Sequence, residues 1–357
     1  MRIYKPKIID LFSGAGGMSL GFTDSRFGGC GEIVLALDNN QSAIDTHKAN
    51  FVGKAVCANI ENWLENNEVP SADIVIGGPP CQGFSLLNKN RDGDERRQLW
   101  RPFLKFVELS NARIFVMENV VQLNKSSELE DIRQAAESIE FKIRNEVLLA
   151  ADFGVPQKRR RTFVLGFHKD IKQPVFPPFP THRNPDHKSN LPVWLTVKDA
   201  ISDLPEPTRT EILGEAPLNL HIKRNPTAKS LKRYAAVPQG GNRFDLLRNA
   251  PEITPDCWKR KKTGGTDLFG RLWWDRPSVT IRTEFFKPEK GRYLHPDQDR
   301  PITHREAARI MGFPDNFIFK GSKIEIARQI GNAVPPPLAG SVAQGILEVF
   351  MPLAKAS

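Results

Sequence analysis

Cysteine is scarce in this sequence, and long apolar segments are missing from it. The four cysteines, Cys30, Cys57, Cys81 and Cys257, match no zinc or redox spacing, so we expect no metal site. A disulfide framework is not expected in a chain of 357 residues without a secretion signal. No apolar run is long enough to cross a bilayer, and the one near the N-terminus is too short for a signal peptide. These absences argue against a membrane or secreted protein and predict a cytosolic or nuclear one.

An even distribution of charge is also lacking. The net charge is +10, and residues 157–300 hold 28 Lys and Arg against 16 Asp and Glu, a balance of +12. The same segment contains 16 of the 28 prolines. A basic, proline-rich segment beside a near-neutral remainder predicts a polyanion-binding module next to a core domain. The alternative is a basic surface that only improves solubility.

Regular hydrophobic patterning is missing from the middle of the chain. From about residue 181 to 300 loops dominate, and regular structure resumes at Thr303. A hydrophobic content of 39% over this length is enough for one large domain and a smaller one. We therefore expect a core domain over 1–180, a smaller loop-rich domain over 181–300, and a return to the core over 301–357.

The first half, by contrast, alternates apolar strands with helices. Buried strands are predicted at 7–12, 33–38, 73–78, 113–119, 142–150 and 161–167. Helices are predicted between them, at 41–50 and near 97–109. Continuous apolar strands joined by helices indicate an α/β fold with a doubly wound, mostly parallel sheet.

Capping boxes predict where two further helices begin. Ser127 with Glu130, and Thr303 with Glu306, have the required spacing of three residues. A last helix is expected after the prolines at 335–337, ending near 350.

Unusual sequences stand where four of the strands end. SGAGG follows the first strand, Asp38 ends the second, PPCQG follows strand 73–78, and Glu118-Asn119 ends strand 113–119. Ligand sites of doubly wound sheets lie at the carboxyl ends of the strands. The coincidence predicts an active site at this edge of the sheet.

The glycine turn and Asp38 suit a nucleoside cofactor. Gly14, Gly16 and Gly17 allow a ligand to approach the backbone closely, and Asp38 suits a pair of ribose hydroxyls. A nicotinamide fingerprint would need a glycine where Ser19 stands, so that cofactor fits poorly. The alternative is a tight turn without a ligand.

Cys81 stands at a rigid corner, because Pro79 and Pro80 restrict the backbone just after a buried strand. Thiolate is the reactive form of cysteine, and a nucleophilic cysteine usually has a histidine base. No histidine lies near Cys81 in the sequence. The alternative is a buried, inert thiol, and we expect buried or half-buried thiols at the other three cysteines.

Two polar segments complete the predicted site. A carboxylate at Glu118 could protonate or hydrogen-bond a substrate, or it could cap the following turn. In QKRRR, strand alternation puts Gln157, Arg159 and Arg161 on one face, where three planar groups could enter a site. The alternative is a solvated basic run.

Six motifs now stand in order along nearly the whole chain, with a less recognisable stretch at about 181–280. They are DLFSGAGG (10–17), GGPPCQGFS (77–85), ENV (118–120), QKRRR (157–161), REAARIMGFP (305–314) and GNAVPP (331–336). In order and spacing they resemble the motif series of the cytosine-5 DNA methyltransferases. The resemblance implies an S-adenosylmethionine-binding catalytic domain, a smaller target-recognition domain, and double-stranded DNA between them.

The resemblance also implies a mechanism. The target cytosine leaves the duplex, and Cys81 adds to carbon 6 of its ring. Glu118 matches the residue that binds ring nitrogen 3 and the exocyclic amine. Arg159 and Arg161 match positions near the base carbonyl and the catalytic pocket. In this family the thiolate needs no dedicated histidine.

Further positions are assigned by the same resemblance. Those on the cofactor side are Phe12, Gly14, Gly16, Asp38, Asn59, Ile60, Pro79, Leu99, Asn332 and Val334. Those on the DNA side are Ser85, Gln239, Gly240, Gly241, Asn242 and Arg243, and Lys259–Lys262 is expected on phosphate. One departure is that Asn59-Ile60 stands where the family often has Asp-Ile, so a neutral amide replaces a carboxylate.

The compact length resembles a bacterial modification enzyme. We expect a monomer that needs no metal, acts on nucleoid DNA, and belongs to a restriction-modification system with a possible cognate endonuclease. Two other functions stay open: methylation of tRNA, as in one branch of the family, and DNA binding without catalysis. The residues that follow Cys81 argue against methylation of tRNA. DNA binding without catalysis is disfavoured because Cys81, Glu118 and Arg161 are intact.

Overall fold

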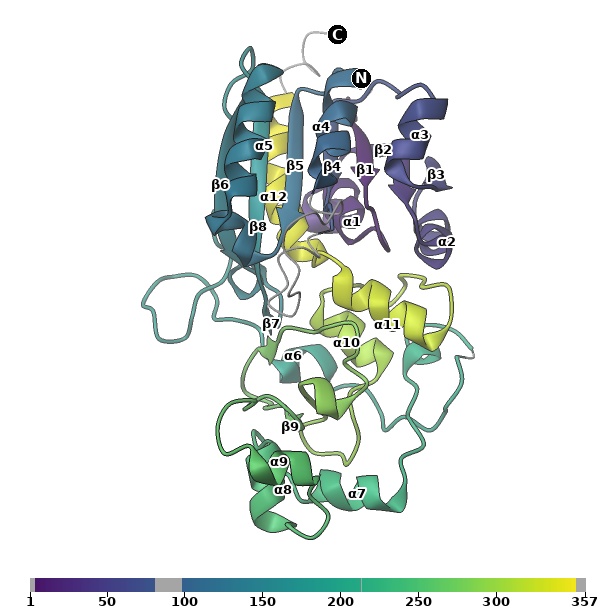
Figure 1. Cartoon of the computed structure of the whole chain (residues 1–357), viewed down its shortest axis with the longest axis vertical. Helices are drawn as coiled ribbons and strands as arrows, with labels where there is room; N and C mark the ends of the chain where they lie inside the picture. The colour runs from purple at the N-terminus through teal and green to yellow at the C-terminus, as the bar shows by residue number, and fades with distance from the viewer. Residues whose placement is uncertain (1–3, 81–97, 213, 351–357) are drawn as a thin grey trace.

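The computed structural model describes residues 4–80, 98–212 and 214–350. A twisted sheet flanked by helices forms the upper half of the molecule in Figure 1, and loops with short helices form the lower half. Cys81 and Ser85 lie outside the described residues. Within the described residues, no helix has the length and apolar character needed to span a membrane.

Seven strands make the main sheet, in the order β3-β2-β1-β4-β5-β8-β6. The strands are β1 (Lys7–Leu11), β2 (Glu32–Asp38), β3 (Lys54–Cys57), β4 (Ile74–Gly77), β5 (Ile114–Asn119), β6 (Phe141–Leu149) and β8 (Arg160–His168). The first five are parallel, and β8 runs antiparallel to both β5 and β6. The prediction of an α/β fold with a mostly parallel sheet is confirmed. Strand β3 was not predicted, because its four residues carry too little apolar pattern.

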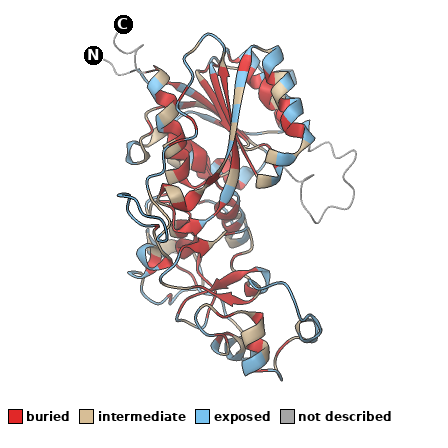
Figure 2. Cartoon of the chain, turned by 90° about the vertical axis from the view of Figure 1, so that its left-hand side faces the viewer, coloured by how far each residue is buried: buried red, intermediate tan, exposed pale blue. Residues whose placement is uncertain are grey.

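Helices cover both faces of this sheet, as Figure 2 shows by the burial of its strands. The helices are α1 (Gly17–Thr23), α2 (Gln41–Asn50), α3 (Ile60–Asn66), α4 (Trp100–Leu109), α5 (Ser127–Ser138) and α12 (Pro336–Leu347). Successive strand residues point to opposite faces, so Ile8 belongs to the core cluster that holds side chains of α1 and α12, while Ile9 belongs to the cluster that holds side chains of α3, α4 and α5. Each large apolar side chain buried in this way stabilises the fold by about 1.5–3 kcal/mol.

One of the two predicted capping boxes is present. Thr303 accepts a hydrogen bond from the backbone of Glu306, and the Glu306 carboxylate accepts one from the backbone of Thr303. The box at Ser127 was wrong, because Ser126 is the residue that precedes α5 and Ser127 is already helical. We expected buried or half-buried thiols at Cys30, Cys57 and Cys257. This prediction is confirmed for Cys30, which is half-buried, and wrong for Cys57 and Cys257, which are exposed.

The lower half contains six short helices and four short strands among the described residues. The helices are α6 (Val197–Ile201), α7 (Ala228–Ala235), α8 (Arg243–Asn249), α9 (Asp256–Arg260), α10 (His304–Ile310) and α11 (Lys323–Asn332). The strands are β7 (Gln157–Lys158), β9 (Gly270–Arg271), β10 (Ser278–Val279) and β11 (Arg292–Leu294). Parallel pairing of β7 with β10 and of β9 with β11 joins segments far apart in the chain.

Candidate active site at the carboxyl edge of the sheet

The glycine turn between β1 and α1 has a backbone that only glycine adopts readily. Gly14 and Gly16 have φ angles of 53° and 88°. A Cβ on Gly16 would lie 2.4 Å from the ring of Phe51, whereas one on Gly14 would meet nothing within 4 Å. The turn is therefore packed against the protein on one side and open on the other. Phe12 also has a positive φ, of 55°.

Asp38 at the end of β2 holds this turn in place. Its Oδ2 accepts a hydrogen bond of 2.9 Å from Gly14 N, and its Oδ1 accepts one of 2.9 Å from Asn40 N. Burial raises the pKa of Asp38 above its ordinary value, and these backbone donors oppose the rise. Each carboxylate oxygen has a second lone pair, so Asp38 keeps acceptor capacity for a ligand hydroxyl.

Two distant segments reach the same place. A Cβ on Gly17 would lie 2.3 Å from the carbonyl oxygen of Val334, so the link between α11 and α12 touches the glycine turn. Ala58 N donates to Asp38 O, which brings the end of β3 to the end of β2. The side chain of Asn59 then caps α3, its Oδ1 accepting from Glu61 N at 2.9 Å and from Asn62 N at 3.1 Å. Among residues 4–80, 98–212 and 214–350 the Asn59 amide nitrogen donates to no acceptor, so it remains available as a donor.

A buried polar chain that the sequence did not reveal supports the turn from behind. Ser19 Oγ donates to Asp10 Oδ2 at 2.6 Å, and His47 Nε2 lies 3.1 Å from the same Oγ. Burial raises the pKa of Asp10 to about 7 and lowers that of His47 to about 4. An aspartate inside the apolar strand KIIDLF was the available signal for this chain.

Glu118 and Arg161 form an ion pair at the end of β5. Arg161 Nε lies 2.9 Å from Glu118 Oε1, and both side chains are largely buried. Among the described residues no donor is well aligned with Glu118 Oε1, so this oxygen keeps acceptor capacity. A Cβ on Gly78 would lie 3.3 Å from Glu118 Oε2, and Asn119 Nδ2 donates to Pro79 O at 3.1 Å. The backbone that leads to Cys81 therefore passes beside the Glu118 carboxylate.

The other two polar groups predicted on this face lie elsewhere. Arg159 is 1% exposed, and its Nη1 donates to Ile281 O at 3.2 Å and to Gly331 O at 3.1 Å. Burial lowers the pKa of Arg159 to about 9. Gln157 is fully buried, and its Oε1 accepts from Ile281 N at 2.9 Å. Of the three side chains, Arg161 meets Glu118, while Gln157 and Arg159 join the sheet to the lower half.

The predicted DNA-side residues lie in the lower half, around the start of α8. Gln239 is exposed, and the carbonyls of Gly240 and Gly241 each accept from Arg292 Nη1 at 2.8 Å. Asn242 caps α8, its Oδ1 accepting from Phe244 N. Arg243 is 1% exposed, so its guanidinium faces the protein and not solvent.

The remaining residues predicted on the cofactor side differ in exposure. Ile60, Pro79 and Val334 are buried, Leu99 is half-buried and precedes α4, and Asn332 is exposed.

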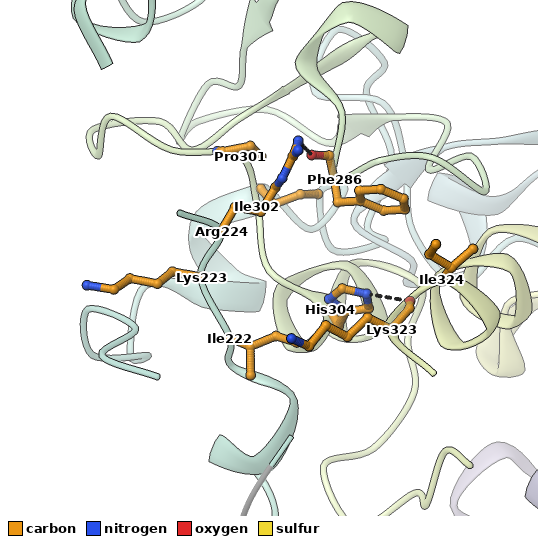
Figure 3. A pocket seen from close by; sticks show the side chains of 9 residues that line it. All are labelled: Ile222, Lys223, Arg224, Phe286, Pro301, Ile302, His304, Lys323 and Ile324. Carbon is orange, nitrogen blue, oxygen red and sulfur yellow. Dashed lines mark hydrogen bonds between the residues drawn. The ribbon is translucent and has the colours of Figure 1, made fainter. Parts of the chain in front are cut away.

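A separate pocket of about 200 Å³ lies between the start of α10 and the start of α11 (Figure 3). It is lined by none of the residues predicted for the site. Within residues 4–80, 98–212 and 214–350, no cluster of His, Cys, Asp and Glu side chains has a metal-binding arrangement.

The sheet reverses its strand order between β1 and β4, and the polar groups gather at that switch point. This arrangement defines an α/β protein with a ligand site at the carboxyl edge of its sheet. The family model for C-5 cytosine-specific DNA methylases matches residues 6–348, and the chain belongs to that family. The resemblance predicted from the six motifs is thereby confirmed.

Known relatives cover nearly the whole chain. Type II methyltransferase M1.HphI of Haemophilus parahaemolyticus is 35% identical over 96% of this chain and 86% of its own length. Type II methyltransferase M.NgoFVII of Neisseria gonorrhoeae is 34% identical, with coverage of 97% and 87%. The crystal structure of a putative DNA modification methyltransferase encoded within a prophage (E. coli) matches with a TM-score of 0.72 at 25% identity, covering 97% of this chain and 99% of that one.

Proposed function

We propose that this enzyme transfers a methyl group from S-adenosylmethionine to carbon 5 of a flipped-out cytosine, in a specific double-stranded DNA sequence. The observation that carries the proposal is the buried Glu118–Arg161 pair, beside the backbone that leads into Cys81. The relatives' names support a type II restriction-modification role. A cognate endonuclease would then share the site in the bacterial cytoplasm, where the enzyme acts on nucleoid DNA as a monomer.

The cofactor would lie on the open side of the glycine turn. Space beside Gly14 admits a ligand that no side chain fills, and Asp38 offers acceptors for ribose hydroxyls. The free amide nitrogen of Asn59 faces the adenine edge in this proposal, with Ile60 beneath the ring. Phe12, Gly16, Pro79, Leu99, Asn332 and Val334 complete the proposed cofactor set. When bound, S-adenosylmethionine supplies an electrophilic methyl group.

The protein's own groups would carry the rest of the chemistry. The Cys81 thiolate adds to carbon 6, and the electron pair displaced from the 5,6 double bond makes carbon 5 electron-rich enough to take the methyl group. Glu118 hydrogen-bonds ring nitrogen 3 and the exocyclic amine, and Arg161 holds that carboxylate in place. Loss of the proton from carbon 5 then expels Cys81 and restores the ring. Arg159 acts in this scheme by holding Gly331, next to the proposed cofactor residue Asn332.

DNA recognition would fall to the basic lower half. We propose 1–180 as the catalytic domain, 181–300 as the target-recognition domain and 301–357 as the return to the catalytic domain. Gln239, Gly240, Gly241 and Asn242 form a turn that can approach base edges, with Ser85 near the flipped base. Lys259–Lys262 would contact phosphate, which positions the duplex without reading its sequence.

The test is base-resolution mapping of methylcytosine after expression in an unmethylated host, with labelled methyl transfer to purified DNA and tRNA. We expect methylcytosine in one defined DNA sequence and no transfer to tRNA. We also expect Cys81→Ser to abolish turnover while DNA binding survives. Transfer to tRNA alone, or DNA binding without any transfer, would replace the proposal with one of the two other functions. Normal activity in the Cys81→Ser variant would refute the nucleophile assignment.

A further inference from the structure

Arg243 is a buried cation that binds backbone carbonyls. Its guanidinium makes five hydrogen bonds of 2.6–3.3 Å, and every acceptor belongs to the segment 258–265. The acceptors are the carbonyl oxygens of Trp258, Lys261, Thr263, Gly264 and Gly265. Its guanidinium carbon also lies 3.9 Å from the centre of the Phe244 ring. Within the described part of the chain, no carboxylate lies at ion-pair distance from Arg243.

The segment that Arg243 holds begins at the end of α9 and continues as an exposed loop. Residues 259–267 are all exposed, and Gly264 and Gly265 have φ angles of 70° and 63°. The segment carries the run of four cations at 259–262. Lys259 pairs with Asp256 at 3.1 Å, whereas Arg260, Lys261 and Lys262 form no ion pair with any described residue. Three cations, Arg260, Lys261 and Lys262, are therefore unpaired among the described residues, on a backbone that the buried Arg243 guanidinium binds.

A second arginine ties the same loop to the turn before α8. Arg292 Nη1 donates to the carbonyls of Gly240 and Gly241, and its Nη2 donates to Thr266 O at 3.2 Å. Arg292 is 4% exposed, and its guanidinium carbon lies 4.1 Å from the centre of the Trp273 ring. Arg243 directly follows this turn, so two buried arginines, Arg243 and Arg292, join the turn to the loop.

We infer that Arg243 is a positioning residue for DNA recognition, which aligns the cationic loop 258–265 with the turn 239–242. It contacts no DNA itself. The inference rests on the proposed function, and it replaces the expected direct contact of Arg243 with DNA. Guanidinium geometry explains the choice of residue, because five N–H groups in a fixed plane can reach carbonyls that the three donors on one lysine nitrogen cannot.

Arg243→Lys keeps the charge and removes this geometry. Once the methylated site is mapped, we expect the KM for DNA to rise about tenfold, because the loop's phosphate contacts are misplaced. We also expect methylation of sites that differ by one base to increase relative to the mapped site, with the KM for S-adenosylmethionine unchanged. The control is Arg248→Lys on the same helix, where the side chain is 72% exposed and both measurements should stay at wild-type values. Unchanged KM for DNA and unchanged site selectivity in folded Arg243→Lys would overturn the inference.

A double variant tests the loop even if Arg243→Lys does not fold. Lys261→Ala/Lys262→Ala removes two exposed side chains, and the slope of log affinity against log salt should fall by about two. An unchanged slope would show that the loop makes no phosphate contact and would overturn the inference. The proposed function and the positioning role of Arg243 can be refuted separately. A wild-type enzyme that methylates no DNA refutes the proposed function. A wild-type enzyme that methylates a defined site, with Arg243→Lys behaving identically, refutes the positioning role alone.

Discussion

Two carboxyl groups of this enzyme are both buried, yet their pKa values are shifted in opposite directions, and the difference lies in their partners. Asp10 is paired with a neutral hydroxyl, so burial dominates and raises its pKa to about 7. Glu306 is equally buried, but Arg300 binds both of its oxygens at 2.7 and 2.8 Å. Although burial opposes it, this pairing lowers the pKa of Glu306 to about 2. A cation within hydrogen-bond distance thus decides whether a buried carboxyl is charged.

Asp10 gives the enzyme a stability that depends on pH. Its folded-state pKa lies above its ordinary value of 3.8, so the folded state binds more protons and stability falls as the pH rises from about 4 to 7. Asp10→Asn keeps an acceptor for Ser19 and removes the titration, so the loss, at most about 4 kcal/mol, should disappear. Urea unfolding at several pH values measures this, with exposed Glu65→Gln as the control. An unaltered pH profile in Asp10→Asn would show that Asp10 is charged throughout.

Glu118 is the residue whose charge matters most for the proposed reaction. Glu118→Gln keeps the shape of the side chain but loses the carboxylate that Arg161 binds and that faces the base in our proposal. We expect kcat to fall at least about 100-fold, the usual scale for loss of a positioned acid-base group. Affinity for DNA should change little. Single-turnover rates and binding assays distinguish these effects, with exposed Glu137→Gln on α5 as the control. Retention of wild-type kcat would remove Glu118 from the mechanism.

At the scale of elements, α1 contacts the link to α12 on the side where we propose that the cofactor binds. A Cβ on Gly17 would lie 2.3 Å from Val334 O, and that carbonyl cannot move without shifting the whole 332–334 segment. Gly17→Ala should therefore raise the KM for S-adenosylmethionine about tenfold and destabilise the fold by about 1–3 kcal/mol, as overpacking does. Exposed Lys48→Ala on α2 serves as the control for the kinetics and for thermal unfolding. An unchanged KM would show that this segment does not border the cofactor.

Prediction of the elements succeeded where the pattern was local. Strands β1, β2, β4 and β5 have apolar runs bounded by polar turns, and the sequence placed each of them within one or two residues. The start of α5 was misplaced by one residue because Ser127 has the capping-box spacing to Glu130, whereas the helix begins after the neighbouring Ser126, whose side chain makes no cap. The position of β8, between β5 and β6, could not be predicted, because pairing order depends on the whole sheet.

At the scale of the whole molecule, most of the excess positive charge lies outside the seven-stranded sheet. The balance of +12 lies within residues 157–300, most of which lie in the lower half of Figure 1. DNA binding through about six phosphate contacts should weaken about 10³-fold between roughly 50 and 200 mM salt. Titration of a labelled duplex across that range measures the slope, and binding of S-adenosylmethionine is the control that should vary little. A flat dependence for DNA would mean that this segment is not the DNA-binding surface.

The sequence by itself determined the α/β fold and the family, and it predicted the edge of the sheet at which we propose the site. Those features depend on local apolar periodicity and on short motifs, which a linear chain carries in full. Only the tertiary structure decided the roles of its buried arginines. Arg159 binds carbonyls 122 and 172 residues away, and Arg243 binds a loop instead of facing outwards. A guanidinium donates to the acceptors that folding places beside it. Here these acceptors are backbone carbonyls, which every residue type has, so the sequence cannot indicate which of them an arginine will bind.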